Sequence, residues 1–78
     1  MIVTLDKTKE GQKGKILRIT GGHGVRHRLE ALGVHPDDEI KIVKIAILGG
    51  PVLIEIHGSQ VAIGRGMAQK IEVEIEEK

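Results

Sequence analysis

The residues that could do chemistry are concentrated in one stretch, GGHGVRHRLEALGVHP, at positions 21–36. Three of the four histidines lie there, and His23 and His27 are four residues apart. On a helix, this spacing puts two imidazoles on one face, where they can bind a metal. Two imidazoles alone make a weak site, and a third ligand would have to come from His35, Glu30 or another chain. We therefore expect two surface histidines with at most weak affinity for a divalent metal, Fe2+ or Zn2+, and no tightly bound cofactor.

The glycines around His23 raise a second possibility, a phosphate-binding turn at the start of a helix. However, GGHGVR lacks the third glycine of a dinucleotide-binding fingerprint and the Gly-Lys-Ser/Thr ending of a phosphate-binding loop. No strand–helix–strand pattern surrounds it. We interpret the glycines as a flexible loop that leads into a helix.

A catalytic group is hard to assemble from the rest of the chain. The absence of cysteine excludes a thiol nucleophile, disulfides, thiolate zinc sites and iron–sulfur clusters. The single serine, Ser59, falls in an expected turn, and the acidic run 37–39 follows Pro36 at the start of a strand. His57 falls on an outward strand position and should be solvated. Because no nucleophile, base and orienting group come together, we expect that the protein is not an enzyme.

The composition also limits the partners. Phe, Tyr and Trp are absent, and the formal net charge is only +1. Binders of nucleic acid use aromatic faces and a basic surface, so we expect no nucleic-acid partner. No apolar run approaches the ~18 residues of a membrane span, and the first residues have no signal-peptide pattern. We expect no membrane insertion and a cytoplasmic location.

One short helix should carry the histidines. From about Gly24, the apolar residues Val25, Leu29 and Leu32 recur at i, i+4 and i+7, which is one helix face. That face should pack on the core and leave the histidines on the solvent side. Gly33 follows as the expected C-terminal cap.

The remaining apolar segments have the period of two that predicts strands. Two breaks in this alternation, at Ile16–Leu17 and Val43–Lys44, predict bulges. Gly49–Gly50 and Gly58–Ser59 are the expected two-residue hairpin turns. The residues expected to face the core after the helix are Ile40, Ile42, Ile45, Ile47, Val52, Ile54, Ile56, Val61, Ile63, Ile71, Val73 and Ile75.

About five short, bent strands in 78 residues favour a sheet that closes on itself, because closure removes exposed edges. The fold class is therefore mainly β: residues 1–78 should form a single domain, a small SH3-like β-barrel with one short inserted helix. A five-stranded OB-type barrel is the alternative, although that fold usually needs more residues.

A barrel without aromatics or a catalytic group must act through shape and apolar contact. Leu48 and Leu53 are the apolar residues that the core does not need, since Leu53 has the outward parity and Leu48 adjoins a turn. Pro51 should stiffen this turn, so that it presents a preorganised apolar knob. We predict a partner-binding surface at Leu48, Gly49, Gly50, Pro51 and Leu53, although Leu53 could instead pack under the helix or a terminus.

The order of these segments resembles the FeoA family, the small cytosolic component of ferrous iron transport. The resemblance rests on Leu5, Gly11, KILRI followed by GG, RLEALGV before a proline, ILGGPVLIEI, GSQVAI, Ala68 and the closing IEVEI. The chain departs from the family where Asp37 and Asp38 replace a glycine, where Ile47 replaces a frequent proline, and in GRGMA.

The resemblance implies an SH3-like barrel and a role beside FeoB, the membrane iron permease with a GTP-binding domain. It implies no catalysis, and it leaves homo-oligomer formation open. Two hypotheses follow. The first is an accessory protein that acts by protein–protein interaction with this permease. The alternative is a transition-metal sensor or carrier that uses His23 and His27, although two neutral imidazoles without a carboxylate are a poor Fe2+ site.

Overall fold

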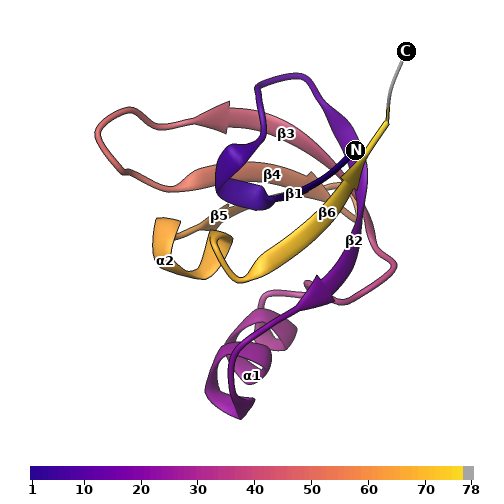
Figure 1. The fold of residues 1–78 in the computed structure, drawn as a ribbon, viewed down its shortest axis with the longest axis vertical. Helices are drawn as coiled ribbons and strands as arrows, with labels where there is room; N and C mark the ends of the chain where they lie inside the picture. Colours follow the sequence, from indigo (N-terminus) through magenta and orange to yellow (C-terminus); the bar gives the residue numbers. More distant parts are fainter. Residues whose placement is uncertain (77–78) are drawn as a thin grey trace.

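The computed structural model describes residues 1–76, which form six strands, two α-helices and one 3-10 helix (Figure 1). Five strands were expected, and the additional one is the short N-terminal strand. In chain order the elements are β1 (Ile2–Thr4), η1 (Leu5–Lys7), β2 (Lys13–Ile19), α1 (His23–Ala31), β3 (Glu39–Ile45), β4 (Val52–Ile56), β5 (Ser59–Ile63), α2 (Arg65–Ala68) and β6 (Ile71–Ile75).

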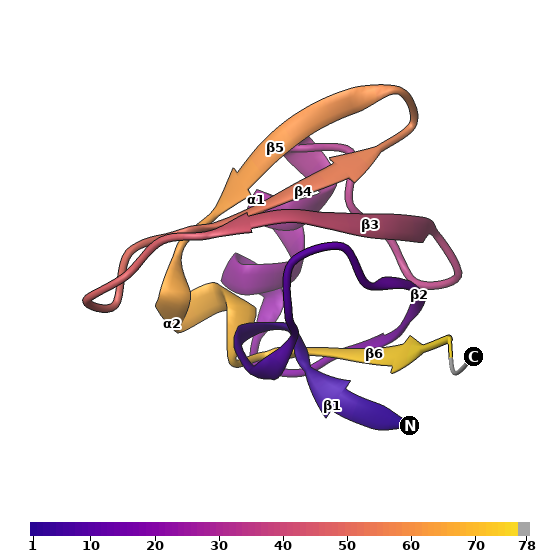
Figure 2. The ribbon, with the colours of Figure 1, turned by 90° about the horizontal axis from the view of Figure 1, so that it is seen from above.

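All strand pairs are antiparallel, in the order β1-β6-β2-β3-β4-β5. The sheet folds over so that β3, β4 and β5 lie across from β1, β2 and β6 (Figure 2). Both predicted bulges are confirmed, because the register shifts between Ile16 and Arg18 and between Ile42 and Lys44. These bulges bend the two longest strands around the core.

The core contains only aliphatic side chains. The predicted alternation is confirmed in β4 and β6, where Val52, Ile54, Ile56, Ile71, Val73 and Ile75 are at most 3% exposed. Leu5 on η1 and Leu29 on α1 close the core from outside the sheet, both at 0% exposure. Ile47 was expected to continue the inward parity of Ile45, but the strand ends at Ile45 and Ile47 is 83% exposed.

Gly14 lies where β2 pairs with β3 and β6 at once, opposite Ile40 and Ile75. A Cβ at this position would fall on the carbonyl oxygen of Glu74 and lie 3.1 Å from Cδ1 of Ile75. The two halves of the folded sheet are therefore joined at a point where only glycine fits.

Helix α1 is anchored mainly by Leu29 and ends in a Schellman motif. Gly33 has a φ of 82°, its N–H donates to the carbonyl of Glu30, and the N–H of Val34 donates to the carbonyl of Leu29. The predicted cap at Gly33 is confirmed. The predicted burial of Leu32 is wrong, because Leu32 is the C-cap residue and is 45% exposed, while Val34 fills the core beyond the cap.

Both hairpin turns lie one residue earlier than predicted. Leu48 and Gly49 have φ values of 58° and 76°, and His57 and Gly58 have φ values of 52° and 77°. Positive φ at both central residues defines a type I′ turn, in which glycine takes the second position. The expectation that glycine takes the first position of the second turn, Gly58–Ser59, is therefore wrong. None of the helices within residues 1–76 is long and apolar enough to cross a membrane.

Candidate functional site

The β3–β4 hairpin projects from the sheet, and its tip carries the most exposed large apolar side chains of residues 1–76 (Figure 1). Leu48 is 99% exposed and Ile47 is 83% exposed. The predicted residues Gly49 and Pro51 are exposed beside them, and Gly50 is half-buried. Sequence reasoning missed Ile47, although its place directly before the Leu48–Gly49 turn could have indicated it.

Leu53 lies on β4 and is not part of this tip. It pairs with Lys44 on β3 and Ala62 on β5, and its side chain is half-buried. Its position between the buried Val52 and Ile54 turns it away from the core, as its parity predicts. The structure therefore keeps Leu48 and Leu53 apart, and the knob consists of Ile47 and Leu48. We call these two side chains the apolar tip.

The base of the hairpin is braced by Arg65, the first residue of α2. Its guanidinium donates from Nη2 to the carbonyl of Ala46 at 2.9 Å and from Nε to that of Gly50 at 3.2 Å. A third bond runs from Nη1 to the carbonyl of Asp6 at 3.4 Å. Backbone bonds from Ala46 to Pro51 and from Gly50 to Ile47 close the loop. One half-buried cation thus joins the hairpin, η1 and α2.

His23 and His27 both lie on α1 and are exposed, as their helix positions predict. Within residues 1–76, no group of three or more His, Asp or Glu side chains is arranged so that it could hold a metal ion. The two imidazoles therefore have no third protein ligand among the described residues, and weak metal binding there stays a prediction.

A second histidine cluster was not predicted. Asp38 is 15% exposed and lies between two imidazoles, with Nε2 of His57 at 3.1 Å and Nδ1 of His35 at 3.5 Å. Its Oδ2 also accepts a bond of 2.8 Å from the N–H of His35. His57 is exposed as predicted, but it contacts Asp38 and so ties the β4–β5 turn to the loop before β3. The eighteen residues between Asp38 and His57 left no local signal of this contact.

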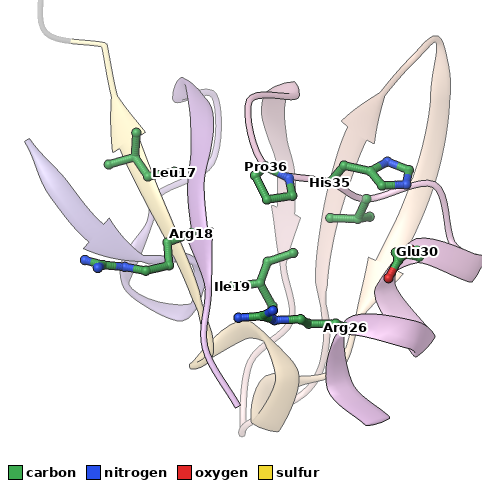
Figure 3. A pocket seen from close by; sticks show the side chains of 8 residues that line it. Leu17, Arg18, Ile19, Arg26, Glu30, His35 and Pro36 are labelled. Carbon is green, nitrogen blue, oxygen red and sulfur yellow. The ribbon is translucent and has the colours of Figure 1, made fainter. Parts of the chain in front are cut away.

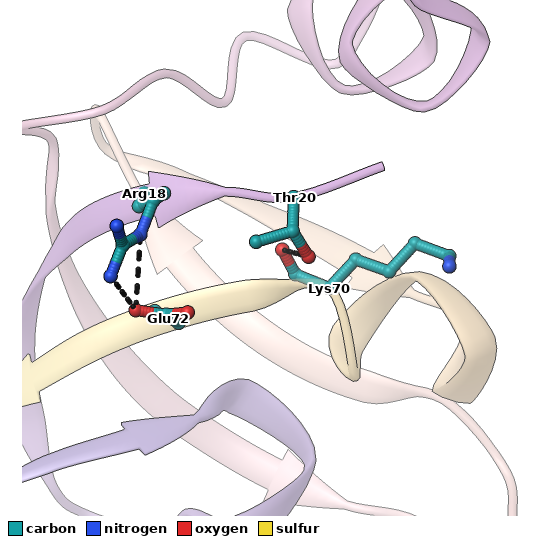
Figure 4. Close-up of polar contacts among 4 residues, drawn as sticks. All are labelled: Arg18, Thr20, Lys70 and Glu72. Carbon is teal, nitrogen blue, oxygen red and sulfur yellow. Dashed lines mark hydrogen bonds and ion pairs between the residues drawn. The ribbon is translucent and has the colours of Figure 1, made fainter. Parts of the chain in front are cut away.

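A groove of about 460 Å³ separates α1 from the end of β2 (Figure 3). Its two arginines, Arg18 and Arg26, do not form one cationic site. The guanidinium of Arg18 turns to β6 and pairs with Glu72 at 2.9 Å (Figure 4). Arg26 and Glu30 carry opposite charges on α1. The groove is lined by Leu17, Arg18, Ile19, Arg26, Glu30, Val34, His35 and Pro36.

A bent antiparallel sheet of short strands that folds over an aliphatic core is the architecture of a small SH3-like module. The FeoA domain family matches residues 3–75 of the 78, and the chain belongs to this family. A protein of Methanocaldococcus jannaschii named "Putative Fe(2+) transport protein A" is 39% identical over 66 residues, which cover 85% of this chain and 78% of the relative.

Solved structures show the same fold. The crystal structure of an iron uptake regulatory protein (FeoA) is 33% identical and superposes with a TM-score of 0.91, covering 97% of this chain and all of the other. A manganese-dependent transcriptional repressor in complex with manganese superposes with a TM-score of 0.90 at 21% identity, and the match covers 96% of this chain but 37% of the repressor. These matches confirm the predicted SH3-like barrel; the second one bears on the fold alone.

Proposed function

We propose that this protein is a small cytoplasmic accessory protein of ferrous iron uptake, which acts by binding an FeoB-type membrane iron permease through its apolar tip. Membership of the FeoA family supports the role in iron uptake. The observation that carries the binding mode is the tip itself, because Ile47 and Leu48 are 83% and 99% exposed on a hairpin that Arg65 braces.

The energetic argument favours a protein pocket as the receptor of the tip. Burying one fully exposed leucine contributes about 1.5–3 kcal/mol, and interface hot spots are side chains of this kind that enter a dry pocket. Because Arg65 already fixes the hairpin, little conformational entropy is lost when the tip docks. The proposal does not involve catalysis or a bound metal.

The replacement Leu48→Asn tests this proposal. Asparagine tolerates positive φ better than leucine, so the type I′ turn at φ 58° should be kept or stabilised. Loss of the apolar side chain should weaken binding to the permease by about 10–100-fold, which corresponds to the energy of burying one leucine. Affinity is measured by calorimetry or pull-down with the detergent-solubilised permease, with and without guanine nucleotide.

The matched control is Leu32→Asn, which removes a 45% exposed leucine at the far end of α1. It should leave the affinity unchanged. Equal affinity of the Leu48→Asn variant and the unmodified protein would contradict the proposed surface. No binding by the unmodified protein under any nucleotide condition would contradict the proposed partner.

A further inference from the structure

Strand β5 is an edge of the sheet that lacks the usual protection against pairing. The strand order ends at β1 and β5, and Figure 2 shows β5 at one margin of the folded sheet. β1 is three residues long, whereas β5 has five residues and pairs with β4 without a bulge. Natural edges carry charges, proline or bulges that block further strands. Residues 56–64, which include β5, contain no Lys, Arg, Asp, Glu or Pro.

The hairpin register shows which backbone groups are free. The two-residue turn makes Ile56 and Ser59 a hydrogen-bonded pair, so Ser59, Val61 and Ile63 direct their backbone groups to β4. The N–H and C=O groups of Gln60 and Ala62 then point outward. Both residues are exposed, and no element within residues 1–76 pairs with this side of β5.

We propose that β5 pairs with β5 of a second copy of this chain, antiparallel, about a two-fold axis at Val61. In this register, Gln60 of each copy exchanges both backbone hydrogen bonds with Ala62 of the other. The two Val61 residues face each other as a non-hydrogen-bonded pair, whose side chains approach closely on the core side of the sheet. Val61 is half-buried and packs against the core, and the second copy covers the rest of it.

The composition of β5 favours pairing with β5 of a second copy over pairing with a strand of a different protein. Like charges directly opposite each other destabilise a pair of strands, and a strand without charges meets no such penalty against itself. A two-fold contact also uses the same patch on both chains, so one surface is sufficient. A single pair of five-residue strands buries less than the ~1,200 Å² of a stable interface. The dimer is therefore weak and forms as the protein concentration rises.

Disulfide trapping tests the register, since the chain has no cysteine of its own. In the proposed dimer the two Val61 Cα atoms are about 4.5 Å apart, within the range that a disulfide spans. The two Ala62 Cα atoms, displaced along the strands, are more than ~7 Å apart and cannot be bridged. The Val61→Cys variant should become mostly covalent dimer under mild oxidation, whereas the matched Ala62→Cys variant should stay monomeric.

Sedimentation equilibrium of the unmodified protein is the second measurement and needs no permease. The average mass should rise from one chain toward two with concentration. The Ala62→Pro variant, which loses an outward N–H, should stay at one chain while its melting transition remains cooperative. A constant monomer mass up to millimolar concentration would overturn the proposal. So would equal cross-linking at positions 61 and 62.

Discussion

Leu48 combines two properties that a residue chosen for stability alone would not have. It lies in the left-handed region at φ 58°, which costs a residue with a Cβ about 1–2 kcal/mol, and its side chain is 99% exposed. Asparagine or glycine would make the same turn at lower cost. Local departures from the stable choice of residue occur at functional sites, which is why we assign the partner contact to this residue.

Metal binding is also decided at the residue scale. His23 and His27 offer two imidazoles on an exposed helix, and no third protein ligand within residues 1–76 joins them. We expect calorimetry to show Zn2+ binding no tighter than micromolar, and weaker binding of Fe2+, as the usual order of affinities predicts. The His27→Ala variant should remove the weak Zn2+ heat.

The His57→Ala variant is the control, because His57 belongs to the separate cluster at Asp38. It should leave the Zn2+ heat unchanged. A tight stoichiometric site that His27→Ala abolishes would contradict this prediction and favour a metal sensor or carrier.

At the scale of elements, α2 serves as a brace for the β3–β4 hairpin. Its four residues bury Ala68 and place the Arg65 guanidinium against three backbone carbonyls. Just before the loop, Glu10 accepts a further bond from the N–H of Ile45. The rigidity of the apolar tip therefore depends on an element that begins seventeen residues after Leu48.

The replacement Arg65→Gln should loosen this hairpin without unfolding the sheet. Glutamine can satisfy one of the three carbonyls, so the free energy of unfolding should fall by about 1–3 kcal/mol. Backbone order parameters of residues 46–51, measured by NMR relaxation, should drop from about 0.85 toward 0.6 or below. Order parameters elsewhere should not change.

Arg18→Gln is the matched control. Arg18 is 69% exposed and its ion pair with Glu72 lies on the surface, so its loss should cost at most about 1 kcal/mol. The order parameters of the tip should stay as they are in the unmodified protein. An unchanged tip in the Arg65→Gln variant would show that Arg65 does not brace it.

On the scale of the whole molecule, the fold depends on the junction at Gly14. Alanine there would collide with the backbone of Glu74, where β2 pairs with both halves of the sheet. Overpacking of this kind costs about 1–3 kcal/mol, so the Gly14→Ala variant should have a clearly lower urea midpoint. Gly66→Ala is the opposite control. A Cβ added at position 66 would have nothing within 4 Å, so alanine there in α2 should keep or raise the urea midpoint.

The sequence could predict the fold wherever the signal was local and periodic. The alternation of Val52, Ile54 and Ile56 identified a buried face correctly, and the broken alternation at Ile16–Leu17 identified a bulge. The turns were displaced by one residue because glycine fits either central position, and only the backbone conformation of Leu48 shows which one it takes.

The candidate site was predicted in part. Leu48 and its neighbours were identified because apolar residues beside a turn have no core to enter. The brace by Arg65 and the contact of His57 with Asp38 each join segments that are distant in the sequence. Arg, His and Asp are also common on protein surfaces, so their presence alone does not indicate a contact. Such contacts depend on how the whole sheet folds over, which no local pattern encodes.

The guanidinium of Arg65 bonds only to carbonyl oxygens, and every amino acid has one. The hydrogen bonds of the brace therefore do not depend on which side chains stand at positions 47 and 48. Over evolution, position 47 can change freely, and position 48 can change within the limits of its positive φ, to suit a changed receptor while the loop keeps its shape. For protein engineers, the same property makes the hairpin a grafting site, in which a new dipeptide would be displayed in a conformation that the scaffold supplies.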